Sequence, residues 1–112
     1  MSDYITLKEN RDFQRLYKRG KSFVSPILVI YILKNKSNNL RYGITTGKKI
    51  GNAVRRSRAR RVIRAAFWEI APNVKRGYDI VFVARGKAPF VKSTQVLSDM
   101  EYQFKKAEMY NN

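Results

Sequence analysis

The segment from Lys48 to Arg64, KKIGNAVRRSRARRVIR, contains eight basic residues and no acidic residue. It nevertheless has the apolar spacing of an ordered helix. At about 100° per residue, one side of that helix collects Ala59, Val62, Ile63, Ala66, Phe67 and Ile70. Gly51 and Asn52 mark a good start, because an Asn at the N-cap accepts a hydrogen bond from a free backbone N–H. We therefore expect a helix with one side buried and its arginines turned away from that side.

The charge of this segment opposes helix formation in isolation. Cations in the first turn oppose the helix dipole, and arginines three or four residues apart repel by a few tenths of a kcal/mol per pair. A polyanion reverses both effects, because phosphate is favoured at helix N-termini and by guanidinium groups. A solvated basic face is the alternative interpretation. The density and single sign of the charge favour nucleic acid over it.

The chain as a whole is strongly basic, with 24 Lys and Arg against 8 Asp and Glu and a net charge of +16. No Asp or Glu occurs between Phe13 and Trp68, although fifteen Lys and Arg lie in that interval. A field of this sign attracts RNA, DNA or an anionic membrane surface. With 112 residues, of which 44% are hydrophobic, the chain is expected to form a single domain over residues 1–112.

The residue types for most protein-borne catalysis are missing. The chain has neither Cys nor His, which excludes disulfides, the usual zinc sites and catalytic triads that depend on a His base. The acids are scattered, mostly at predicted helix surfaces and ends: Asp3, Glu9, Asp12, Glu69, Asp79, Asp99, Glu101 and Glu108. We therefore predict no catalytic centre and no metal site in the protein itself.

Residues 43–49, GITTGKK, have a superficial likeness to a phosphate-binding loop. The spacing between the glycines is one residue too short for a Walker motif, and no Ser or Thr follows the lysines. We reject a nucleoside triphosphate site, although the lysines can hold phosphate just before a helix N-terminus.

The chain has neither an apolar signal region near its N-terminus nor an apolar run of about eighteen residues. We therefore predict a soluble, cytoplasmic protein.

The pattern of apolar residues predicts an α+β two-layer sandwich with the order α-β-β-β-α-β-α and a roughly four-stranded mixed sheet. The polar segment 34–39, KNKSNN, favours a hairpin between the second and third strands. The first helix is expected at about 9–18, and the last helix is expected to start near 93. The four strands are expected at about 21–24, 27–33, 40–46 and 78–84.

The chain is rich in aromatic residues, with seven Tyr, six Phe and one Trp. Phe13 and Tyr17 share a face of the first helix, and Tyr31 lies on the strand expected beside it. These three rings suit either a core or the stacking of RNA bases beside a cationic surface. Core or partly buried positions are expected for Phe23, Phe67, Trp68, Phe82 and Phe104.

The basic segment resembles the signature of the protein subunit of bacterial ribonuclease P. The resemblance rests on KKIGNAV at 48–54 followed by RSRARR at 56–61. It extends over nearly the whole chain, from Asp12 and Phe13 to the strand at 78–84 and the C-terminal helix. Ser57 stands where the family has Asn, and Arg55 where the family often has an apolar residue.

The resemblance implies a non-catalytic protein partner of a catalytic RNA that removes the 5′ leader from precursor tRNA. It also implies a left-handed βαβ crossover through the basic helix and Mg²⁺ ions held by the RNA subunit, not by the protein. The implied leader-binding cleft contains Phe13, Tyr17 and Tyr31. The implied RNA-subunit contacts are Lys48, Lys49, Asn52, Arg56, Ser57, Arg58, Arg60, Arg61 and Arg64.

Three other functions are compatible with the charge. A structural RNA-binding protein of ribosomal type explains the arginines but leaves the aromatic residues unexplained. A DNA-binding helix usually carries Asn, Gln or mixed polar residues to read base edges, and this segment offers almost only Arg. A membrane-surface helix needs a free apolar face, which the core requires here. We expect no DNA partner and no membrane partner.

Overall fold

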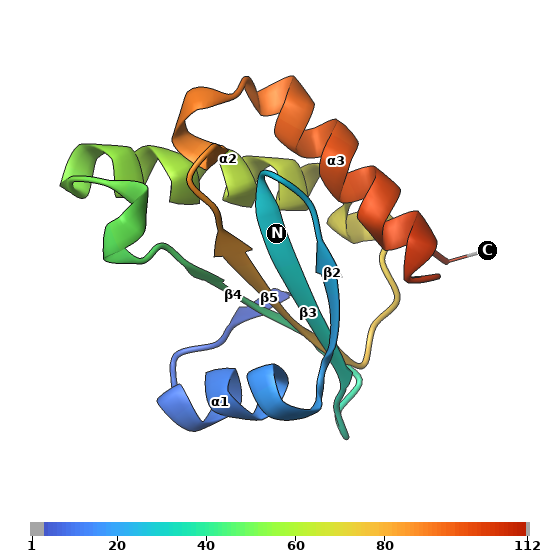
Figure 1. Ribbon diagram of the computed structural model, residues 1–112. Helices are drawn as coiled ribbons and strands as arrows, with labels where there is room; N and C mark the ends of the chain where they lie inside the picture. Colours follow the sequence, from blue (N-terminus) through green and yellow to red (C-terminus); the bar gives the residue numbers. More distant parts are fainter. Residues whose placement is uncertain (1–3, 112) are drawn as a thin grey trace.

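The computed structural model describes residues 4–111, which form a five-stranded sheet and three α-helices (Figure 1). The strands are β1 (Tyr4–Thr6), β2 (Lys21–Val24), β3 (Leu28–Lys34), β4 (Leu40–Thr45) and β5 (Tyr78–Ala84). The helices are α1 (Asn10–Arg19), α2 (Ala53–Ile70) and α3 (Ser93–Lys106). Short 3₁₀ turns occur at η1 (Lys48–Ile50), η2 (Ala71–Asn73) and η3 (Ala88–Phe90). The predicted order is confirmed, and β1 is an additional strand, too short to give a periodic pattern.

The strand order in the sheet is β1-β4-β5-β3-β2. β5 lies between β3 and β4, antiparallel to the first and parallel to the second. The predicted hairpin between β3 and β4 is therefore wrong. The continuous apolar run of β5 makes it the central strand, paired on both edges and buried on both faces. The polar segment instead crosses the start of β5, where the Gly77 N–H donates to the Asn39 carbonyl at 3.1 Å.

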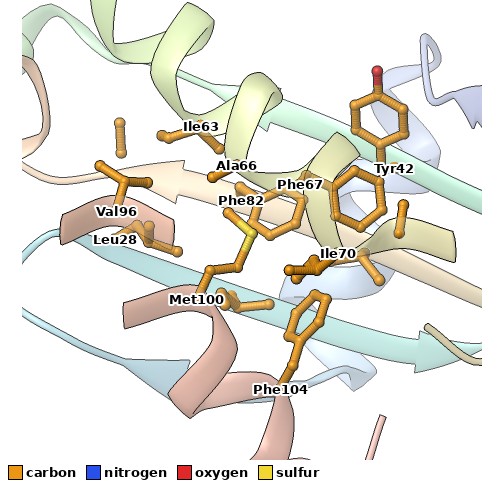
Figure 2. Close-up of a cluster of buried hydrophobic side chains, with 14 of the residues drawn as sticks. Leu28, Tyr42, Ile63, Ala66, Phe67, Ile70, Phe82, Val96, Met100 and Phe104 are labelled. Atoms are coloured by element: carbon orange, nitrogen blue, oxygen red, sulfur yellow. The ribbon is translucent and has the colours of Figure 1, made fainter. Parts of the chain in front are cut away.

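The main core lies between the sheet and the helices α2 and α3 (Figure 2). The predicted apolar side of α2 is buried over its whole length. Phe67 is fully buried, with its ring centroid 4.9 Å from that of Tyr42 and 5.1 Å from that of Phe82. Trp68 departs from the prediction, since it is 53% exposed and its Nε1 donates to the Tyr42 hydroxyl at 3.2 Å.

The helix α1 packs on the opposite face of the sheet (Figure 1). Leu16 and Val81 are fully buried there. The sequence pattern predicts two layers; α1 adds a smaller third layer, because β3 and β5 are apolar on both faces and the second face also needs cover. Gly43 allows this packing: an added Cβ would lie 2.6 Å from Cζ of Phe13.

The connection from β4 to β5 carries the basic helix. The two strands are parallel neighbours, so the chain must cross over one face of the sheet between them. α2 makes this crossing on the face opposite α1 (Figure 1). Between residues 4 and 111, no helix is both long and apolar enough to cross a lipid bilayer.

Candidate RNA-binding surfaces

The start of α2 is fixed by two residues that the sequence marks. Gly51 has φ of 129°, a left-handed conformation that favours glycine. Asn52 is the N-cap, as predicted, and its side chain accepts a hydrogen bond from the Arg55 backbone N–H at 3.0 Å. Lys48 and Lys49 lie exposed in η1, immediately before this helix N-terminus.

The arginines of α2 spread over three sides of the helix instead of one outward face. Arg60 lies on the β4 side, where its Nη1 donates to Oγ1 of Thr46 at 2.7 Å. Arg58 lies on the η3 side, where its Nε donates to the Pro89 carbonyl at 2.8 Å. Arg61 points outward and has no hydrogen-bond or ion-pair partner within residues 4–111.

Three further predicted contact residues also lie on α2. Arg56 and Arg64 are half-buried, and Ser57 is exposed. Nη1 of Arg56 reaches the Gly51 carbonyl at 3.4 Å, which is a weak hydrogen bond at best. Every predicted basic contact residue thus lies on α2 or on η1, and the helix presents cations over about half of its circumference.

Two exposed rings next to these arginines were not predicted. The guanidinium of Arg55 lies 5.0 Å from the centroid of Phe90, a ring that is 65% exposed. At helical spacing, Trp68 continues the outward side of α2 beyond Arg61 and Arg64. The exposure of Phe90 could have been predicted, because it lies in a loop with Gly86 and Pro89, and loops run over the protein surface.

The predicted aromatic residues come together on one flank of α1. Phe13 lies over Gly43 on β4. Tyr17 is 36% exposed, and its ring meets the half-buried ring of Tyr31 edge-on, at 5.1 Å between centroids and 70° between planes. The three rings therefore form one row along the helix–sheet junction.

Beside this row, part of the sheet lies uncovered by α1. The strand register places one residue from each of four strands in line across this face: Val24, Val29, Val83 and Thr45. Val24 is 58% exposed and the other three are half-buried. We call these four residues the open strip. One end of the open strip adjoins Thr46, which holds Arg60 of α2.

Within residues 4–111, no group of three or more Asp or Glu side chains is close enough to hold a metal ion. The cations of α2 can attract phosphate, and the exposed rings beside them can stack bases.

A family model described as Ribonuclease P matches residues 1–108. The chain belongs to the ribonuclease P family. A ribonuclease P protein component from Clostridioides difficile is 54% identical over 80 residues, covering 70% of each chain. One from Clostridium novyi is 38% identical over 107 residues, covering 94% of this chain and 95% of that relative. The structure of the Staphylococcus aureus RNase P protein superposes with a TM-score of 0.85 at 36% identity, covering 95% of this chain and 97% of that one.

Family membership agrees with the mixed α+β fold. It assigns the chain a role in the 5′ processing of tRNA, within a ribonucleoprotein endoribonuclease that contains an RNA subunit. The resemblance drawn from residues 48–61 is confirmed at the level of the family.

Proposed function

We propose that α2 and η1 bind the catalytic RNA subunit of ribonuclease P, while the open strip and its aromatic row receive the 5′ leader of precursor tRNA. The observation that carries this proposal is the bond between Arg60 and Thr46. It brings a cation of α2 to the end of β4, next to Thr45 of the open strip. A strand lying on the open strip would thus have a basic helix at one end and stacking rings along its side.

The proposed division of residues follows these two surfaces. The leader side contains Phe13, Tyr17 and Tyr31. The RNA-subunit side contains Lys48, Lys49, Asn52, Arg56, Ser57, Arg58, Arg60, Arg61 and Arg64. On that side Arg61 has the strongest support, because it points outward without a protein partner in residues 4–111, and its guanidinium is free to pair with phosphate.

In this proposal the chemistry of phosphodiester hydrolysis belongs to Mg²⁺ ions held by the RNA. The protein offsets repulsion between the phosphates of the two RNAs and orients the leader. It has no His base, and within residues 4–111 no group of three or more acidic side chains is placed to hold a metal ion. The cytoplasm remains the predicted location.

Binding to precursor and mature tRNA tests the leader surface in the assembled ribonucleoprotein. Tyr31→Ala should weaken binding of precursor tRNA by about 1–3 kcal/mol if a base stacks on this ring. Mature tRNA, which has no leader, should bind as before. Tyr31→Phe keeps the ring and should behave like the wild type. Tyr102→Ala, which removes a 61% exposed ring from α3, is the matched control and should change neither affinity.

A structural RNA-binding protein of ribosomal type would give a different pattern. Affinity would then not depend on leader length, and Tyr31→Ala would affect precursor and mature tRNA alike. Either result would remove the leader from this proposal.

A further inference from the structure

A cavity lies on the flank of α1 that faces away from the aromatic row. It has a volume of about 490 Å³ and lies where the C-terminal half of α1 meets the ends of β3, β4 and β5. It is lined by five cations and one acid: Arg15, Arg19, Lys34, Lys36, Arg41 and Asp79. We call it the cationic pocket. It lies on the sheet face opposite α2, and its strand residues Arg41 and Asp79 are four residues along their strands from Thr45 and Val83 of the open strip.

The floor of the cationic pocket is a fixed ion pair. Asp79 is 1% exposed and accepts from Nε of Arg41 at 2.7 Å and from Nη2 of Arg41 at 2.6 Å. Nδ2 of Asn35 also donates to this carboxylate, at 2.8 Å. The hydrogen bond from Arg41 to Asp79 raises the pKa of Arg41 above its ordinary value. The pairing leaves Nη1 of Arg41 without an acceptor in residues 4–111.

A second guanidinium converges on the same floor. Nη2 of Arg15 lies 3.6 Å from Oδ2 of Asp79 and donates to Oδ1 of Asp12 at 2.6 Å. Two buried acids therefore position two arginines at the pocket. Burying these carboxylates is unfavourable unless they are paired, so the arginines are held in place by the fold.

The remaining cations of the pocket are not balanced by acids. Arg19, Lys34 and Lys36 have no hydrogen-bond or ion-pair partner within residues 4–111. Like charges gathered around a concave surface raise the local positive potential and concentrate anions there. Guanidinium groups with free N–H donors and lysine ammonium groups both bind phosphate in proteins.

We propose that the cationic pocket binds a phosphate group of an RNA backbone, at a third site separate from α2 and from the open strip. The pocket gives the protein a contact on the flank of α1 that neither surface reaches. The proposal does not depend on which RNA the α2 surface binds.

The test compares two double variants of the full chain that each remove two exposed lysines. Lys34→Gln/Lys36→Gln alters the rim of the pocket and leaves the pair between Arg41 and Asp79 intact. Lys105→Gln/Lys106→Gln, at the end of α3, is the control with the same change in net charge. Thermal unfolding should show that both variants fold.

The first probe is a single-stranded RNA of about ten nucleotides, a length that one basic surface can bind, with its affinity measured over a range of salt. Loss of each phosphate contact should flatten the slope of log affinity against log salt by about 0.7. The pocket variant should show this change and the control variant should not. Equal flattening in both variants would overturn the proposal, since the lysines would then supply only general charge.

The second probe is inorganic phosphate, followed through the side-chain NMR signal of Nε–H in Arg41. A saturable shift that is weakened in the pocket variant supports a phosphate site. If this shift occurs but the RNA slope is the same in both variants, the pocket binds free phosphate, and the RNA part of the proposal fails. If the pocket variant changes neither the salt slope of RNA binding nor the phosphate-induced shift, the whole proposal fails.

Failure here is distinguishable from failure of the proposed function. Lys34 and Lys36 lie outside α2, the aromatic row and the open strip. The discrimination between precursor and mature tRNA that tests Tyr31 should therefore persist in the pocket variant whatever the outcome.

Discussion

At the scale of single residues, Gly43 controls how closely α1 approaches the sheet. An added Cβ would lie 2.6 Å from Cζ and 2.7 Å from Cε1 of Phe13, and 3.5 Å from Cβ of Leu7. An added Cβ would therefore force the Phe13 ring or α1 itself to shift. The same ring belongs to the proposed leader surface, so stability and leader binding are linked at this position.

We predict that Gly43→Ala lowers the free energy of unfolding by about 1–3 kcal/mol, the usual effect of overpacking. Denaturant unfolding measures this change. The matched control is Gly47→Ala, where an added Cβ meets no atom within 4 Å and φ is −74°. Equal stabilities of the two variants would show that Phe13 does not rest on Gly43.

Tyr110 is a second residue with a direct prediction. Its hydroxyl is buried without a hydrogen-bond partner in residues 4–111, and burial, with a smaller contribution from the charge of Glu101, raises its pKa to about 12. The unfolded chain releases this proton near pH 10 and the folded chain only near pH 12. The titration of Tyr110 therefore leaves stability unchanged below pH 10 and lowers it as the pH rises from 10 to 12, because only the unfolded chain can then ionise this hydroxyl.

Tyr110→Phe removes this titration. The stability of the wild type relative to the variant should fall between pH 10 and 12, as measured by chemical unfolding at fixed pH values. At neutral pH the variant should be as stable as the wild type or more so, because an unpaired buried hydroxyl is removed. Parallel pH curves would contradict the assignment.

Residue roles were predictable where the cause is local. Asn52 could be identified as a cap because capping involves residues three positions apart. The partner of Arg60 could not be predicted, since Thr46 comes from the end of a strand whose position depends on the whole sheet. Trp68 was misassigned for a different reason: local helical spacing puts it opposite the buried side, and its aromatic character was given more weight than that spacing.

At the scale of elements, α2 combines an apolar side that stabilises the fold with cations that weaken the isolated helix. Its first turn has no acidic residue to match the positive end of the dipole. Asn52 is the one side chain that caps this end within the described residues. A substitution at Asn52 can therefore change protein stability and the proposed RNA binding in opposite directions.

We predict opposite effects of Asn52→Asp on these two properties. The carboxylate keeps the cap and interacts favourably with the helix dipole, so the unfolding free energy should stay equal or rise by about 0.3–1 kcal/mol. Affinity for the RNA subunit should fall, because a negative charge enters the proposed contact surface. Asn52→Ala is the complementary control and should lower stability by about 1 kcal/mol. Unchanged RNA affinity in Asn52→Asp would place the contact away from the start of α2.

Element types were predictable from periodicity, and their pairing was not. The spacing of apolar residues in the sequence directly predicts the buried side of α2 and the buried strands β3 and β5. The hairpin failed because a polar turn between two strands is equally compatible with a third strand inserted between them. β1 was missed because three residues at a sheet edge form too short a pattern.

At the scale of the whole molecule, the sheet separates the two proposed binding surfaces. One face carries the main core and holds α2, whose arginines are directed away from the sheet or toward its ends. The other face is only partly covered by α1, with the open strip on one flank and the cationic pocket on the other. The basic helix could be predicted from sequence, but the open strip depends on the register of four strands and became visible only in the fold.

The central claim is that this chain supplies binding surface to a catalytic RNA and cleaves no bond itself. The most direct measurement adds the purified chain to a bacterial ribonuclease P RNA at low magnesium and follows removal of the leader from precursor tRNA. We predict that the protein and RNA together remove the leader, and that the protein alone leaves precursor tRNA intact. Cleavage by the protein alone, or unchanged cleavage by the RNA when the protein is added, would contradict the claim.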